Sequence, residues 1–316
     1  MDRLANNHRQ QLLEQLVVRS VPWLLRQQLP TGELVSYRDI DGYATPFACP
    51  LLSALALDAL DCLDTSSPHF HERLFDLVPA AGRAQFRTIV STLRWRLRLH
   101  LAASQSSNGC WRRFGLHGDS PFDLATTAFC YLMYLDKISR PQRDYATLTT
   151  QLSASQPDDL LGQIFTVRLL NLAGSCDAAV PTALFVRIES LSDPILPLWA
   201  IAQAHRQRAL TLDPTQRAIM LHLALEQMTP SGVFGNRLHN VLGITILTVC
   251  DDGRPAIGAA VDQCIDTLLL DPQPPWLWPR DLLVYGASSA AVTLALALRS
   301  LAQAVLAPRE LEIAPC

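Results

Sequence analysis

The 316-residue sequence lacks several features that mark particular classes of protein. It has no run of about eighteen apolar residues free of charge and proline, so no membrane-spanning helix is expected. Its polar start, Met1–His8, leads into a helix and does not resemble a signal peptide. The net charge is −3 and no basic stripe is present, which argues against nucleic acid as a principal partner.

The eight cysteines are scattered, and no two of them form a Cys-x-x-Cys pair. Most lie within apolar helical segments, where cysteine behaves as a small hydrophobic residue. This distribution indicates neither a disulfide framework nor a zinc site, and it fits a reducing compartment. We therefore expect a cytoplasmic globular protein.

Strand-like alternation is also nearly absent, whereas apolar residues recur with helical spacing along almost the whole sequence. Residues of hydrophobic type make up 49% of the chain, which implies a large interior. No Ser/Gly-rich linker divides the chain, so we expect one domain over residues 1–316. The spacing predicts helices at about 9–28, 46–63, 83–105, 123–135, 142–154, 158–173, 178–191, 193–206, 213–228, 240–250, 255–270 and 286–306.

These segments form roughly six hairpins, and in each the first helix is amphipathic and the second is apolar nearly all round. Helices of the second kind must be buried on every side. We therefore predict an all-α fold, a single (α/α)6 barrel of about twelve helices. An inner apolar ring would lie inside an outer amphipathic ring, with each hairpin stacked on the next.

The segment from Gly109 to Phe129 joins a turn that contains Gly and Trp to an apolar helix. Asp123 stands at the expected N-cap, with Pro121 before it and the good helix former Leu124 after it. Backbone N–H groups and the positive end of the helix dipole would gather around residues 123–127. Taken alone, this pattern is also that of an ordinary capped core helix.

The loops that lead into the apolar helices carry partial copies of one pattern. Gln105–Trp111 keeps Gln, Gly and Trp in the spacing Q-x-x-x-G-x-W, which resembles the repeat of the terpene cyclase and squalene–hopene cyclase group. Degenerate copies of this repeat are found in Gly32–Leu34, in Gly232–Phe234, and at Gln273 with Trp276. At the level of repeats, the resemblance spans most of the chain.

The segment Asp123-Leu124-Ala125-Thr126-Thr127 resembles the D-x-D-D-T-A motif of class II terpene cyclases. It is closer to the D-x-D-T-T variant of drimane-type sesquiterpene cyclases. The resemblance implies an isomerase that acts on a linear prenyl diphosphate, here farnesyl diphosphate. Protonation would start its closure to a bicyclic product such as drimenyl diphosphate, with the diphosphate retained.

In that family the middle Asp of the motif protonates the terminal alkene, and here Ala125 occupies its position. A donor strong enough for an alkene needs support for its anion, which Asp123, Thr126 and Thr127 could provide. Either an otherwise catalytic chain carries an Asp→Ala change, or this is a relative that has lost or altered its activity. The intact flanks of the motif favour the first explanation.

The resemblance also implies a diphosphate site, Mg²⁺ and an aromatic cavity. Guanidinium groups in loops suit diphosphate, Mg²⁺ prefers carboxylates together with phosphate oxygens, and carbocations are stabilised by aromatic faces. Each candidate also has an ordinary explanation as a solvated arginine, a helix cap or core packing. The candidates are Arg38, Arg112, Arg113, Arg237 and Arg280 for diphosphate, Asp158 and Asp159 for Mg²⁺, and Phe47, Phe122, Phe129, Trp199, Phe234, Trp276, Trp278 and Tyr285 for the cavity.

Two alternatives use the same barrel. One is a non-catalytic protein that binds a prenyl chain. The other is a subunit like the β-subunit of protein prenyltransferases, which would need an Asp, Cys and His zinc set on the inner helices. The sequence does not assemble such a set.

Overall fold

A computed structural model gives the arrangement of most of the chain. It describes residues 3–40, 43–48, 50–66, 70–107, 109–112, 123–134, 159–172, 182–206, 209–274, 277–278 and 289–306.

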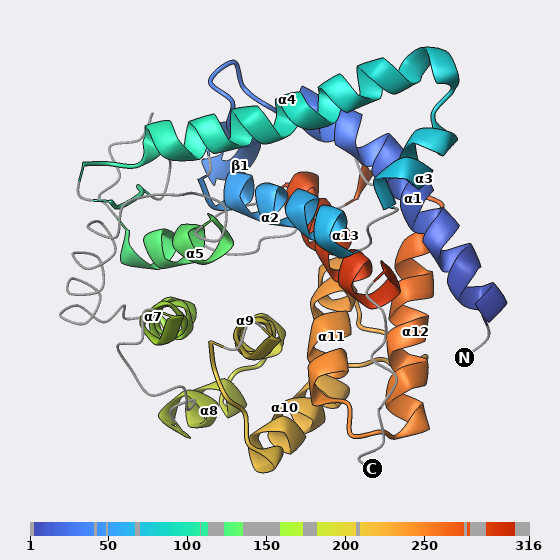
Figure 1. Ribbon diagram of the computed structural model, residues 1–316. Helices are drawn as coiled ribbons and strands as arrows, with labels where there is room; N and C mark the ends of the chain where they lie inside the picture. The colour runs from blue at the N-terminus through green and yellow to red at the C-terminus, as the bar shows by residue number, and fades with distance from the viewer. Residues whose placement is uncertain are drawn as a thin grey trace, which may run out of the picture.

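Apolar helices form a closed ring at the centre of this part of the chain (Figure 1). Each packs against the next in chain order, and the last packs against the first. Such helices bury nearly every side chain, as in α11 and α13, because they are covered on all sides. The ring consists of α2 (Pro50–Ser66), α5 (Leu124–Tyr134), α7 (Leu160–Leu172), α9 (Ile195–Arg206), α11 (Arg237–Cys250) and α13 (Ala290–Leu301).

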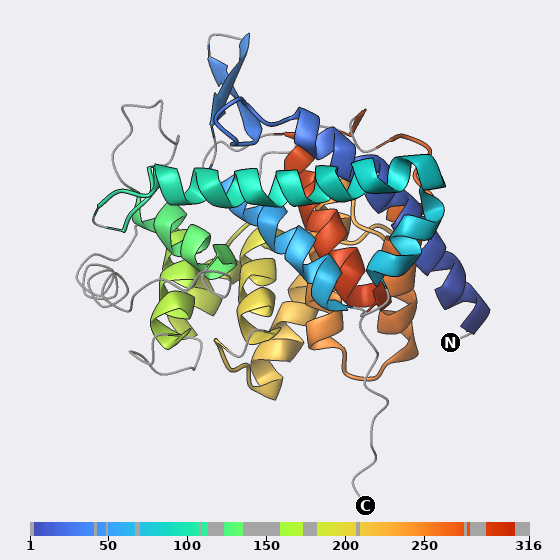
Figure 2. The ribbon, with the colours of Figure 1, turned by 45° about the horizontal axis from the view of Figure 1, so that its top comes forward.

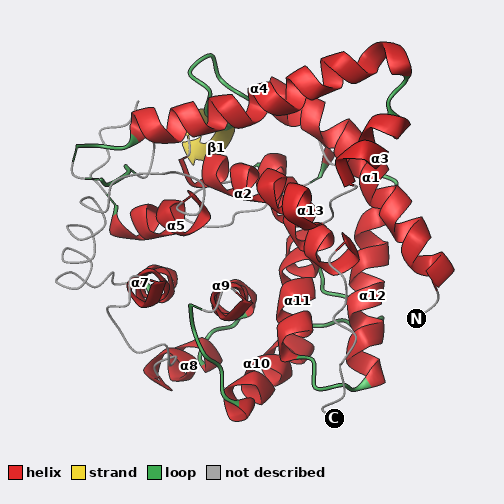
Figure 3. Cartoon of the chain, in the orientation of Figure 1, coloured by secondary structure: helices red, strands yellow, loops and turns green. Residues whose placement is uncertain are grey.

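Helices that alternate with these in the sequence lie outside the ring, as Figure 3 also shows. For example, α4 packs against α2, while α10 and α12 pack against α11. The outer helices bury one face and expose the other. They are α1 (Arg3–Arg26), α3 (Phe70–Leu77), α4 (Ala80–Ser104), α8 (Thr182–Glu189), α10 (Pro214–Glu226) and α12 (Pro255–Leu269).

The predicted all-α barrel, with an apolar inner ring and an amphipathic outer layer, is therefore confirmed. Most predicted helices agree with the observed ones within a few residues, for example 193–206 against Ile195–Arg206. The short helix α3 was not expected, and a π-helical turn, η4 (Ala302–Leu306), extends α13. The helix predicted at 142–154 lies outside the described residues. Among the described helices, none has both the length and the hydropathy that crossing a membrane requires.

A β-hairpin precedes α2 where the sequence indicated a loop and the start of a helix. Strands β1 (Val35–Ile40) and β2 (Tyr43–Ala48) pair antiparallel, with Val35 opposite Ala48. Figure 2 shows this hairpin projecting from the helices. The prediction that a helix begins at about residue 46 was wrong, because that residue is paired in β2 and α2 begins at Pro50.

Three connections from an outer to an inner segment share one turn geometry, in Gln28–Leu34, Gln105–Trp111 and Met228–Phe234. The glycine at the same place in each has a φ of +97°, +83° or +81°, a conformation that side-chain-bearing residues rarely adopt. In the first two turns, the glutamine Nε2 donates to the glycine carbonyl oxygen at 2.7 and 2.8 Å. The last residue of every turn is buried. These segments are therefore structural copies of one another.

Candidate functional site

Asp123 caps α5 and joins that helix to the preceding turn. Its Oδ2 accepts a hydrogen bond from the backbone N–H of Thr126 at 2.7 Å. Its own N–H donates to the carbonyl oxygen of Trp111 at 3.1 Å. The carboxylate thus satisfies a backbone donor that an uncapped helix would leave free, and it complements the helix dipole.

Thr127 fastens the same turn to α5. Its Oγ1 accepts from the backbone N–H of Trp111 at 2.9 Å and lies 3.4 Å from the carbonyl oxygen of Trp111. The Trp111 ring is buried, donates through Nε1 to the carbonyl of Leu101 at 2.9 Å, and packs edge-on against Tyr131. The Thr127 hydroxyl therefore stabilises the fold by holding the Trp111 turn against α5.

Thr126 differs from its neighbour. It is 1% exposed, and its Oγ1 has no hydrogen-bond partner among the residues that the structure describes. A buried hydroxyl without a partner costs about 1–3 kcal/mol by mutational measures, so a ligand or a water is expected beside it. Ala125 lies next to it in the first turn of α5. The side chain of Ala125 is outside the described part of the structure.

Further buried polar atoms in neighbouring helices of the ring have no hydrogen-bond partner within the described ranges. They include Thr166 Oγ1 on α7 and Trp199 Nε1 on α9. Phe129 of α5 and Phe165 of α7 pack edge-to-face at 4.9 Å between centroids. The α5–α7–α9 side of the ring thus offers aromatic surface and a few hydrogen-bonding groups, together with the fully buried guanidinium of Arg168 on α7. The aromatic surface suits a largely hydrocarbon ligand.

The predicted cavity aromatics lie in different parts of the chain. Phe129 and Trp199 are buried in inner helices. Phe234 lies against Gly243 of α11 so closely that a Cβ at residue 243 would stand 2.0 Å from its ring, which indicates core packing. Phe47 is half-buried in the hairpin. Trp278 is buried, and its Nε1 donates to the carbonyl oxygen of Gln273 at 3.2 Å. The remaining candidates, Phe122, Trp276 and Tyr285, lie outside the described residues.

Among the predicted diphosphate ligands, Arg237 is the best described. It forms an ion pair with Asp271, donates from Nη2 to Gln273 Oε1 at 3.0 Å, and lies over the Trp278 ring at 6.0 Å. A diphosphate would have to displace these contacts. Arg112 is half-buried beside Trp111, whereas the Arg38 side chain, Arg113 and Arg280 lie outside the described part.

The carboxylates predicted to hold Mg²⁺ do not form a visible cluster. Asp159 is exposed, and its Oδ1 caps α7 by accepting from the Gly162 N–H at 2.7 Å. Asp158 lies outside the described residues. Within those residues, no three His, Cys, Asp or Glu side chains gather as metal ligands would. Asp159 fits a helix cap better than a metal ligand, and Mg²⁺ stays a prediction.

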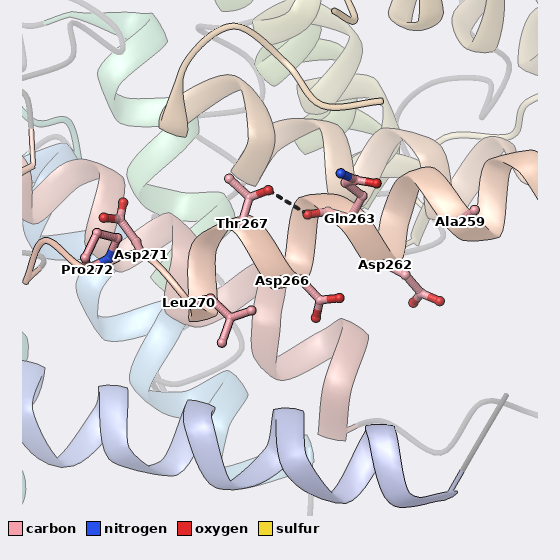
Figure 4. A pocket seen from close by; sticks show the side chains of 8 residues that line it. All are labelled: Ala259, Asp262, Gln263, Asp266, Thr267, Leu270, Asp271 and Pro272. Carbon is pink, nitrogen blue, oxygen red and sulfur yellow. Dashed lines mark hydrogen bonds between the residues drawn. The ribbon is translucent and has the colours of Figure 1, made fainter. Parts of the chain in front are cut away.

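A groove runs along the outer helix α12 (Figure 4). Two of its carboxylates bind Arg9 of α1, Asp262 to Nη1 at 2.8 Å and Asp266 to Nε at 2.7 Å. This groove therefore belongs to the packing of two outer helices. Its lining residues are Ala259, Asp262, Gln263, Asp266, Thr267, Leu270, Asp271 and Pro272.

Sequence analysis missed a buried polar group inside the ring. Asp58, Gln203 and Arg299 are polar residues of three inner helices, and they meet in the interior. Arg299, the one charged residue of the apolar segment that forms α13, was the available signal, because charged residues are rarely buried unless paired. Thr166 was missed as well, since buried threonines are common in cores.

Comparison with solved structures finds likeness to the type II terpene cyclase MstE from Scytonema. One structure, a variant in complex with geranylgeranyl dihydroxybenzoate, has a TM-score of 0.41 at 13% identity, over 95% of this chain and 99% of that chain. The apo enzyme has a TM-score of 0.39 at 14% identity, over 94% and 98%. No family model and no curated protein matches this chain.

Proposed function

We propose that the chain is a class II terpene cyclase whose proton-donor position is occupied by Ala125. Its ligand would be a linear prenyl diphosphate, farnesyl diphosphate in the first instance, and the product a drimane-type bicyclic diphosphate. The observation that carries the proposal is the buried, unpartnered hydroxyl of Thr126, in a motif whose flanking Asp123 and Thr127 are held by the fold.

The first turn of an inner helix is a suitable place for a strong acid. A carboxylic acid there would be kept protonated by burial among apolar side chains. Its anion, once formed, would be stabilised by the backbone N–H groups and the dipole of the helix. The Thr126 hydroxyl could donate to that anion. Alanine supplies no proton, so the present chain is expected to bind substrate without converting it.

The proposed function is tested by restoring the acid. Ala125→Asp should convert farnesyl diphosphate to a bicyclic diphosphate, with Mg²⁺ added because the family resemblance implies it. Ala125→Asn, which has nearly the same shape but no acidic proton, should stay inactive. Products are identified by mass spectrometry after removal of the phosphates. No product from Ala125→Asp with linear C10 to C20 diphosphates would count against a cyclase.

A non-catalytic prenyl-chain binding protein is the second candidate, and one observation favours it. Asp123 and Thr127 are needed to cap α5 and to hold the Trp111 turn. A relative without activity would keep them for folding alone. The intact flanks therefore do not by themselves separate an Asp→Ala change in an active enzyme from a natural loss of activity. Binding of farnesyl diphosphate without turnover by Ala125→Asp would support this candidate.

A further inference from the structure

Polar side chains cross the interior of the inner ring toward the C-terminal ends of α9 and α13. Arg299 of α13 is 3% exposed; its Nε is paired with Asp58 of α2, and its Nη1 donates to Gln203 of α9. Gln203 donates in turn to Thr245 Oγ1 of α11 at 3.3 Å. Because α11 lies between α9 and α13 in the ring, the Arg299 side chain spans the interior.

Arg206 lies one helical turn beyond Gln203, on the same face of α9. It is half-buried, and it forms no ion pair or hydrogen bond with any described residue. Burial and the positive charge of Arg299 both lower the pKa of Arg206. The Nη2 group of Arg299 likewise has no acceptor among the described residues. Arg206 thus follows, on the same face of α9, the glutamine that binds Arg299, and the ion pair to Asp58 compensates only one of the two guanidinium groups.

We propose that Arg206 and Arg299 form a binding site for a phosphate-type oxyanion at the C-terminal end of the inner ring. Planar guanidinium groups match the geometry of phosphate oxygens and bind them through paired hydrogen bonds. An anion between two like charges removes their repulsion and offsets the cost of burying them. The partial exposure of Arg206 leaves the site open to solvent.

Two sources could supply the anion: free phosphate or diphosphate, and the diphosphate head of a prenyl substrate. The second source rests on the proposed function. Thr126 is the third residue of α5 and Arg299 the tenth of α13, so along parallel helices they differ in height by about 10 Å. A head group at Arg206 would then lie at the end of the ring opposite to Asp123, away from Arg112 and Arg237.

Isothermal calorimetry of the full chain with inorganic diphosphate tests the site directly. Arg206→Gln should weaken binding at least tenfold, and Arg206→Lys, which keeps the charge, should weaken it less. Arg254→Gln is the matched control, because Arg254 is a surface arginine paired with Asp252 and should leave binding unchanged. The melting temperature of Arg206→Gln should not fall, since Arg206 has no partner in the described fold. Absence of diphosphate binding by the unmodified chain, or equal binding by Arg206→Gln, overturns the site.

Competition separates the two sources of the anion. If the diphosphate head of the substrate occupies the site, inorganic diphosphate displaces farnesyl diphosphate. Arg206→Gln then weakens the binding of farnesyl diphosphate and leaves the binding of farnesol unchanged. Binding of inorganic diphosphate that depends on Arg206, with no binding of farnesyl diphosphate at all, supports the oxyanion site and contradicts the proposed function. Farnesyl and inorganic diphosphate that both bind equally well to Arg206→Gln contradict the site and leave the proposed function standing.

Discussion

Replacing Thr126 and Thr127 in turn by valine should separate a hydroxyl that holds the fold from one that does not. Each substitution exchanges a hydroxyl for a methyl group of similar size and keeps the β-branch, so helix propensity hardly changes. Both side chains are almost completely buried. The difference between the two variants therefore reports hydrogen bonding.

Thr127→Val leaves the Trp111 N–H without its acceptor, which lies at 2.9 Å in the present protein. An unsatisfied buried donor costs about 1–3 kcal/mol, so the free energy of unfolding should fall by that amount. Thr126→Val removes a hydroxyl that already lacks a partner in the described fold. The free energy of unfolding should then stay the same or rise.

Urea unfolding, followed by far-ultraviolet circular dichroism, measures both changes. The variants are compared with the same slope of unfolding free energy against urea concentration. In the Ala125→Asp background, Thr126→Val should also lower the rate of cyclisation, because the new carboxylate loses a hydrogen-bond donor. Equal destabilisation by the two valines would show that the Thr126 hydroxyl does have a partner in the fold. The distinction between the two threonines would then be wrong.

Two other predictions concern buried charge. Asp58→Leu should lower the free energy of unfolding by about 3–5 kcal/mol, because Arg299 is left buried and unpaired, and adding Arg299→Met should recover most of that loss. Urea unfolding measures these losses. If the loss of unfolding free energy in the double variant equals the sum of the losses in the two single variants, the pairing is contradicted. Burial acts to raise the pKa of Glu33, but hydrogen bonds from His100 and Thr31 outweigh it and lower the pKa to about 2. Since this pKa lies below the ordinary 4.5, Glu33 stabilises the fold above about pH 5 and loses that effect as the pH falls toward 2. Melting temperatures should therefore decline less steeply over this range in Glu33→Gln, and identical declines would refute the assignment.

The helical fold could be predicted because burial imposes a period on the sequence. Most of α9 is apolar on every side, which the interior of a helical barrel accommodates. The hairpin could not be predicted in the same way. Its strands are only six residues long, and their alternation is too short to stand out from a loop.

The roles within the motif were beyond sequence reasoning for a different reason. Thr126 and Thr127 are adjacent and chemically identical, and only the position of the Trp111 turn in space distinguishes their hydroxyls. The pair formed by Asp58 and Arg299 joins residues 241 positions apart, which no local pattern reveals. The N-cap at Asp123, by contrast, depends on local geometry, and the structure confirms it.

The most direct test of the proposed cyclase is a crystal structure of the unmodified chain with a non-hydrolysable analogue of farnesyl diphosphate. We expect the terminal isoprene of the analogue to lie inside the inner ring, in van der Waals contact with the Ala125 methyl and near Thr126 Oγ1. An analogue whose terminal isoprene lies outside the ring, or a ring interior filled by side chains in front of residue 125, would contradict it.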